Sequence, residues 1–154
     1  MARALLDDTD RRIITHLQED GRRPYTTIAA DLGLSEASIR QRVARLVQRK
    51  VIQIVAASNP LDLGLQKAEL GIAVIDASPA RLAEEIAAFP EVDFVAICAG
   101  SFDLIVGVIF RDLEELYEVL VNKVRGLSGV ARVDVFLHLR VVKDTYEWPP
   151  AGVT

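Results

Sequence analysis

The sequence predicts an α+β protein with an all-helical domain at the N-terminus and a βαββαβ domain after it. Residues 1–50 contain three short amphipathic segments separated by glycines, which is typical of short packed helices. From residue 67 on, apolar residues recur in the order strand, helix, strand, strand, helix, strand. We therefore expect domains over residues 1–50 and 67–154, joined by a strand and linker over residues 51–66.

The N-terminal domain should begin with two short helices. Asp7 or Asp8 can cap the first helix, and Gly21 offers a left-handed residue that would end it. The second helix should run from about Tyr25 to Leu32 and stop at Gly33.

Ser35 should cap the third helix. The apolar residues of this helix recur at helical spacing and should face the core: Ile39, Val43, Leu46 and Val47. Two short helices around a glycine turn predict a helix-turn-helix, and the β-branched residues 51–55 predict a strand that would make it a winged type.

The second domain should have the ferredoxin-like order. Ser78 with Pro79 caps one expected helix, and Asp112 with Glu115 resembles a capping box for another that ends at Gly126. The third of four strands is apolar on both faces, whereas two helices cover only one face of a sheet. The uncovered face predicts a homodimer. The strands are expected over residues 70–74, 92–98, 104–110 and 133–141.

The positive charge is confined to one segment of an acidic chain. The net charge is −4, but residues 1–65 carry 10 Lys and Arg against 8 Asp and Glu, whereas residues 66–154 carry 8 against 14. The range Ser35–Lys50 holds five cations and a single anion. This third helix is therefore the candidate surface for double-stranded DNA.

Helical geometry turns polar side chains of the third helix away from its apolar stripe. Arginine can donate two hydrogen bonds to guanine and glutamine can pair with adenine, so we expect this helix to enter the major groove. Two alternatives stay open: a merely solvated polar face, and a structural Arg42 paired with an acid such as Asp31. The candidate DNA contacts are Arg22, Arg23, Ser35, Ser38, Gln41, Arg42, Arg45, Arg49 and Lys50.

Several spaced motifs together resemble the Lrp/AsnC family of bacterial and archaeal regulators. They include Leu6-Asp7, Gly33-Leu34-Ser35, Asn59-Pro60 and Gly129-Val130, so the resemblance spans nearly the whole chain. It implies a transcriptional regulator that binds a roughly palindromic site, with a ferredoxin-like sensor and with dimers that assemble into tetramers or octamers.

The resemblance also implies an effector site. The Gly-x-Tyr/Phe-Asp turn of the family lies between dimers, where a small effector, commonly an amino acid, binds. Two valines stand where relatives often carry threonines. The candidate effector residues are Gly100, Ser101, Phe102, Asp103, Val133 and Val135.

The sequence departs from the family pattern around two of the helices. Val47 and Lys50 replace the usual Glu and Gly, and Pro24 replaces a Ser or Thr cap. A left-handed lysine would cost about 1 kcal/mol, so we expect the third helix to end in another way.

An enzyme is the alternative class, either a ferredoxin-like enzyme or an amino-acid-binding regulatory subunit. His16 and His138 fall in different domains, and no metal-ligand or phosphate-loop spacing occurs, so we expect no catalytic residue, metal or cofactor. We expect Cys98 to be a buried structural thiol. The longest apolar run, Leu104–Phe110, is far too short to span a bilayer, and the N-terminus lacks a secretory pattern, so we expect a cytoplasmic protein without membrane contact.

Overall fold

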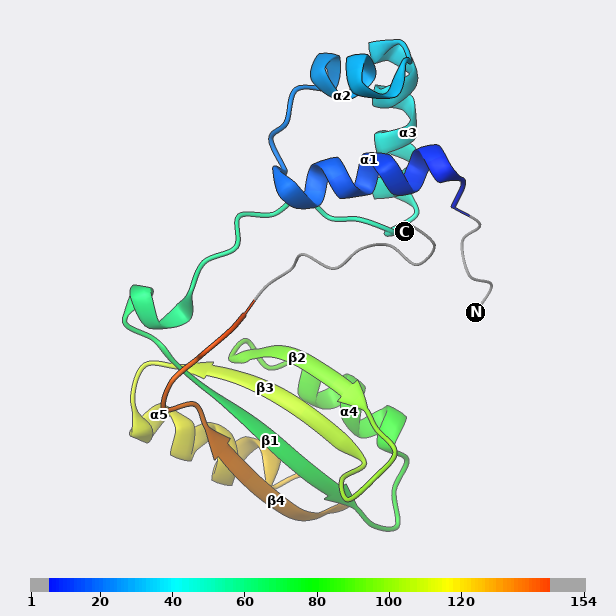
Figure 1. The fold of residues 1–154 in the computed structure, drawn as a ribbon. Helices are drawn as coiled ribbons and strands as arrows, with labels where there is room; N and C mark the ends of the chain where they lie inside the picture. The colour runs from blue at the N-terminus through cyan, green and yellow to red at the C-terminus, as the bar shows by residue number, and fades with distance from the viewer. Residues whose placement is uncertain (1–5, 145–154) are drawn as a thin grey trace. The chain divides into compact units, whose positions relative to one another are not determined.

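The computed structural model describes residues 6–144, and its chain divides into two compact units (Figure 1). Among the described residues, the helical unit holds those up to Ala57 together with Lys143 and Asp144, and the sheet unit is Ser58–Val142. Each unit has its own apolar core. The boundary lies inside the segment expected to link the domains, and residues 145–154 of the expected second domain lie outside the described residues.

Three helices form the helical unit: α1 (Asp8–Glu19), α2 (Tyr25–Leu32) and α3 (Glu36–Gln48). The predicted bounds of α2 are confirmed, and Gly33 ends it in the left-handed region with φ of 65°. The core residues come from all three helices, as an amphipathic bundle requires. They are Ile13, Ile14, Ile28, Ala29, Ile39, Val43 and Leu46.

The end of α1 differs from the prediction. Asp7 caps its start by accepting the Asp10 amide, but Gly21 does not adopt a left-handed conformation. Instead Asp20 is extended with φ of −148°, and its carboxylate accepts the Arg22 amide at 2.8 Å. Because this side chain closes the turn, no left-handed residue is needed.

The end of α3 corrects two expectations. Val47 is not a core residue, because 44% of its surface is exposed. Lys50 does take the left-handed region, with φ of 55°, and donates to the Val47 carbonyl while Val51 donates to that of Leu46. This pair of bonds is a Schellman motif, and the half-buried Val51 packs on the core to complete it.

The strand predicted at residues 51–55 is wrong, since no strand occurs between α3 and β1. A strand needs a partner for its amide and carbonyl groups, and the described chain offers none there. Ile54 and Val55 are exposed. A single 3-10 turn, Pro60–Leu63, follows and ends at the left-handed Gly64.

The sheet unit is a four-stranded antiparallel sheet in the order β2-β3-β1-β4. The predicted βαββαβ order is confirmed, although β4 begins earlier than expected and ends at Leu137, leaving Leu139 89% exposed. Cys98 lies just beyond β2 and is exposed, so its predicted burial is wrong. The strands are β1 (Gln66–Val74), β2 (Val92–Ile97), β3 (Leu104–Phe110) and β4 (Val130–Leu137).

Two helical segments cover one face of the sheet (Figure 1). They are α4 (Pro79–Ala87) and α5 (Leu113–Tyr117), and α5 continues without a break as a π-helix over Glu118–Val124. Asp112 caps α5 by accepting the Glu115 amide at 2.9 Å, as the sequence predicts.

The π-helical turns change which residues of this segment are buried. Leu116, Val119 and Val124 face the core, whereas Leu113, the first residue of α5, is 63% exposed. The wider turn shifts the apolar face away from the period of 3.6 residues used for the prediction.

No helix of the sheet unit, Ser58–Val142, covers the other face of the sheet, here called the open face. On β3, Leu104, Val106, Val108 and Phe110 are buried toward α4 and α5, whereas Ile105 and Ile109 point to the open face and are only half-buried. Phe94 and Phe136 are each 50% exposed. The two-sided apolar character predicted for this strand is thus present.

Candidate nucleic-acid interface

The exposed surface of α3 has a neutral centre and two cationic flanks. The centre lies opposite the buried Ile39, Val43 and Leu46 in helical projection, and its residues are all exposed. One flank contacts α1 and the other contacts α2. The central stripe consists of Ala37, Gln41, Ala44 and Gln48.

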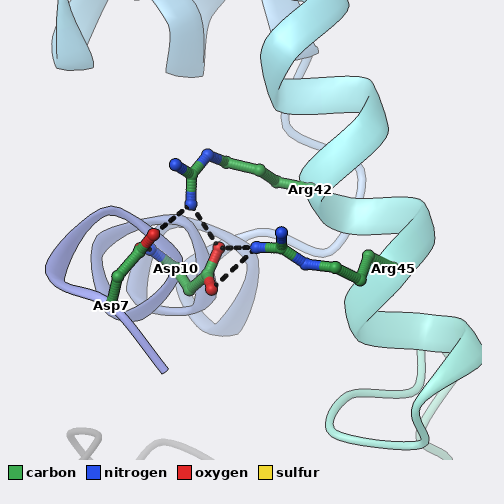
Figure 2. Close-up of polar contacts among 4 residues, drawn as sticks. All are labelled: Asp7, Asp10, Arg42 and Arg45. Atoms are coloured by element: carbon green, nitrogen blue, oxygen red, sulfur yellow. Dashed lines mark hydrogen bonds and ion pairs between the residues drawn. The ribbon is translucent and has the colours of Figure 1, made fainter. Parts of the chain in front are cut away.

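The flank toward α1 is an ion-pair cluster (Figure 2). Arg42 donates through Nη1 to Asp7 Oδ2 at 2.6 Å and to Asp10 Oδ1 at 2.8 Å. Arg45 donates through Nη2 to both Asp10 oxygens at 3.0 Å. Arg42 therefore does pair with acids, as the structural alternative expects, but its partners are Asp7 and Asp10 and not Asp31.

Burial differs sharply within this cluster. The Asp10 side chain is only 5% exposed, against 26% for Arg42 and 47% for Arg45. A buried carboxylate needs hydrogen-bonded cations to compensate for its lost hydration, and two guanidinium groups supply them here. Asp10 also lies in the first turn of α1, where the helix dipole favours an anion.

Asp7 and Arg42 each favour the ionised form of the other. The hydrogen bond from Arg42 is the main cause that lowers the pKa of Asp7 below its usual value of 3.8. Asp7 in turn is the main cause that raises the pKa of Arg42. The pair therefore stays ionised throughout the physiological range.

The flank toward α2 carries Arg40, which the sequence prediction omitted. Arg40 forms an ion pair with Glu36 one turn earlier, and its guanidinium lies 5.4 Å from the centre of the Tyr25 ring. The aromatic ring fixes a cation at the surface without removing its charge. The spacing of Tyr25 and Arg40 in the sequence gave no sign of this contact.

The remaining candidate contacts lie around the same helices. Ser35 caps α3, its hydroxyl accepting the Ser38 amide at 3.2 Å. Arg23 pairs with Glu19 at 2.9 Å and contacts the His16 ring at 2.6 Å.

Three further candidate cations are exposed and show no ion pair within residues 6–144: Arg22, Arg49 and Lys50. They are therefore free to contact phosphate groups, whereas Arg42 and Arg45 are already held on one carboxylate by part of their donors.

The expected effector turn is part of the sheet framework. Asp103 Oδ2 accepts the Val74 amide at 2.7 Å, and the Asp103 amide donates to the Ile72 carbonyl. Gly100 has φ of 151° and Ser101 is exposed.

The aromatic residue of this turn lies on the open face. Phe102 covers Gly71, its ring centre is 6.1 Å from that of Phe136 in an edge-on arrangement, and the Arg132 guanidinium lies 5.4 Å from its centre. The turn therefore presents an aromatic and cationic surface, and not only backbone amides.

The two valines assigned to the effector do not join this turn. Val133 pairs with Ile72 and Val135 with Leu70, so both point to the helix-covered face, and Val133 is only 7% exposed. Phe102 lies on the opposite face over Gly71. Because side chains alternate along a strand, Val133 contributes to the core and not to a surface shared with Phe102.

Two domain families match the chain. The AsnC-type helix-turn-helix domain matches residues 6–47, and the Lrp/AsnC ligand binding domain matches residues 70–148. The chain belongs to the Lrp/AsnC family. As a member, it is a transcriptional regulator with a DNA-binding helix-turn-helix domain and a ligand-binding domain.

Relatives cover nearly the full length of this Lrp/AsnC chain. An HTH-type transcriptional regulator of Pyrococcus horikoshii is 36% identical over 145 residues, which is 92% of this chain and 90% of the relative. The leucine response regulatory protein of Mycobacterium tuberculosis superposes with a TM-score of 0.83 at 28% identity, covering 94% and 100% of the two chains. A Neisseria meningitidis regulator in complex with L-Met has a TM-score of 0.80 at 24% identity, covering 94% and 97%.

A candidate metal centre and a membrane-spanning helix are both absent from the part of this Lrp/AsnC chain that the structure describes. No group of three or more His, Cys, Asp or Glu side chains within residues 6–144 is arranged to hold a metal ion. Among the same residues, no helix has both the length and the apolar character that crossing a membrane would require.

Proposed function

We propose that this regulator binds a roughly palindromic DNA site through α3, with the N-terminal half of that helix in the major groove. The observation that carries the proposal is the exposed face of α3, which holds polar and cationic side chains directly after the Gly33 turn and the Ser35 cap. The proposed contacts are Arg22, Arg23, Ser35, Ser38, Gln41, Arg42, Arg45, Arg49 and Lys50.

The proposed division of labour follows the domains. Residues 1–50 bind DNA, residues 51–66 link, and residues 67–154 sense an effector and form the oligomer. The apolar open face of the sheet favours a homodimer, because a soluble monomer rarely exposes such a surface. We propose that dimers assemble further into tetramers or octamers and that the protein acts in the cytoplasm.

The proposed effector is an amino acid bound at the turn Gly100–Asp103. The match to a ligand-binding domain and the L-Met complex of the Neisseria regulator support this class of ligand. An exposed backbone turn can hold a carboxylate, and a nearby acid can pair with an ammonium group. The regulators among the relatives also favour a role without catalysis over an enzyme.

Selection of binding sites from random DNA, followed by gel-shift titration at several salt concentrations, tests DNA binding. We expect symmetric half-sites about 34 Å apart or a multiple of that distance. Arg49→Ala should weaken binding and flatten the salt dependence by about 0.9 per protomer in log–log slope, because one phosphate contact per protomer is lost. Arg125→Ala, an exposed cation on the sheet unit, is the matched control. Failure to select any sequence would refute the proposal.

Thermal-shift screening with the twenty amino acids, combined with light scattering, tests the effector. We expect at least one amino acid to raise the melting temperature or change the mass of the assembly, since a ligand that binds the folded state stabilises it. A flat response to every amino acid would contradict an amino-acid effector while leaving the DNA-binding proposal intact.

A further inference from the structure

We infer that Asp10 is a positioning residue that holds Arg42 and Arg45 as phosphate contacts. The bases are then read by Ala37, Gln41 and Ala44, the first three residues of the central stripe. This inference rests on the proposed DNA binding and assigns roles within it. Residue type alone would instead favour contacts between both arginines and the base edges.

Release of the two arginines from Asp10 is costly. The Asp10 carboxylate is 5% exposed and accepts hydrogen bonds from both guanidinium groups. If both arginines left it to reach base edges, a buried charge would stay behind without a partner, which is strongly unfavourable. Both arginines therefore keep this contact when the helix meets DNA.

The contacts with the acids leave each guanidinium group with only some of its donors. Arg42 uses Nη1 and Arg45 uses Nη2 for the acids of α1 (Figure 2). An end-on guanidinium fork to guanine O6 and N7 needs both terminal nitrogens, and one of them is occupied in each arginine. The other N–H groups still suffice for a single phosphate oxygen.

The neutral stripe lies between two flanks that carry ion-paired arginines. Ala37, Gln41 and Ala44 are exposed opposite the core, with Arg40 on the α2 side and Arg42 and Arg45 on the α1 side. A helix in the major groove faces base edges at its centre and phosphates at both sides.

The chemistry of the stripe sets the base preference. Glutamine pairs with adenine N6 and N7, and a methyl group contacts the thymine methyl. Gln41 between two alanines therefore favours A·T pairs in the centre of each half-site, with no guanine specified by Arg42 or Arg45.

Site selection with the full-length chain and its variants tests these roles. Gln41→Ala should lose about 5- to 150-fold in affinity for the selected site, relax one A·T position, and leave affinity for random DNA nearly unchanged. Arg42→Ala and Arg45→Ala should each weaken selected and random DNA by the same factor. Each should lower the salt slope by about 0.9 per protomer and select the same sequence as the parent.

Asp10→Asn tests the positioning role directly, with Asp8→Asn as its control. Both remove one negative charge from the first turn of α1, but Asp8 is exposed and has no ion pair among the described residues. Asp10→Asn should lower the ratio of selected to random affinity by about 2- to 10-fold, since the released arginines can then also reach base edges in random DNA. Asp8→Asn should leave the ratio unchanged.

A melting curve identifies any variant that fails to fold. If Asp10→Asn does not fold, Asp7→Asn replaces it, because asparagine preserves the helix cap while releasing Arg42 from one of its two acids. The inference is overturned if Arg42→Ala or Arg45→Ala changes the selected bases, or if both Asp→Asn changes alter the ratio equally. A parent chain that selects no site refutes the proposed function itself, and the inference falls with it.

Discussion

Gly71→Ala should force Phe102 out of its place over the middle of β1. A Cβ atom on Gly71 would lie 2.7, 2.7 and 2.8 Å from three carbons of the Phe102 ring. Ordinary carbon contacts are 3.5–4.0 Å, so the ring has to move by roughly 1 Å. Phe102 would then lose its edge-on contact with Phe136 and weaken its contact with Arg132.

The expected loss of stability is about 1 to 2 kcal/mol. Overpacking costs about 1–3 kcal/mol, and the lower end applies because Phe102 is only half-buried and its ring can swing outward. Loss of the aromatic pair adds about 0.5–1.5 kcal/mol. Alanine recovers about 0.5–1 kcal/mol, because glycine weakens a strand.

A double-mutant cycle with Phe102→Ala isolates this contact. Without the ring, Gly71→Ala should be neutral or slightly stabilising, which gives a coupling energy of about 1–3 kcal/mol. Calorimetry at fixed protein concentration measures the coupling energy. Amide exchange in β1 and β3 reports on the sheet unit separately, because the chain has two units. Additive effects within about 0.5 kcal/mol would refute the account of Gly71 as space for Phe102.

Three further changes test other parts of the structure. Lys50→Gly should stabilise the helical unit by about 0.5 kcal/mol in urea unfolding, because relief of the left-handed strain exceeds the entropy cost of glycine. A loss of stability would contradict the left-handed conformation of Lys50. Asp7→Asn should cost about 0.2–1 kcal/mol above about pH 5. The lowered pKa of Asp7 means that the stabilisation disappears as pH falls from the usual 3.8 through the folded value, so parent and variant should converge once the pH lies below the folded value. Asp103→Ala should lower the free energy of unfolding by about 1 kcal/mol, because the Val74 amide loses its acceptor. It should also change the effector response or the higher assembly, while the dimer still binds DNA. Asp103→Asn keeps that acceptor and is the control, and an equal loss of folding and DNA binding in Asp103→Ala would make the residue purely structural.

Local patterns predicted much of the fold. The bounds of α2, the Ser35 cap and the order of the sheet unit follow from spacing within about ten residues, where sequence and backbone geometry are directly linked. Errors concentrated where an alternative local solution exists. The Asp20 side chain replaced a left-handed Gly21, and Lys50 accepted a strained conformation because the bonds it completes outweigh the strain.

Contacts between distant segments could not be predicted. Asp10 and Arg45 are 35 positions apart, and only the packing of α1 on α3 brings them together. The helical projection correctly placed Arg42 and Arg45 outside the core, but it gives no information on which neighbouring helix supplies their partners. Likewise, only the pairing of Val133 with Ile72, a residue on a distant strand, shows that Val133 points to the helix-covered face of the sheet.

The π-helical stretch Glu118–Val124 has a consequence for how the chain tolerates changes in length. Leu116, Val119 and Val124 are buried at intervals of three and five residues. Deletion of the exposed Asn122 would bring them to the i, i+3, i+7 spacing of an ordinary α-helix, in which all three share one face. The sheet unit therefore has a position where a one-residue deletion, normally ruinous inside a helix, should preserve the packing of the core.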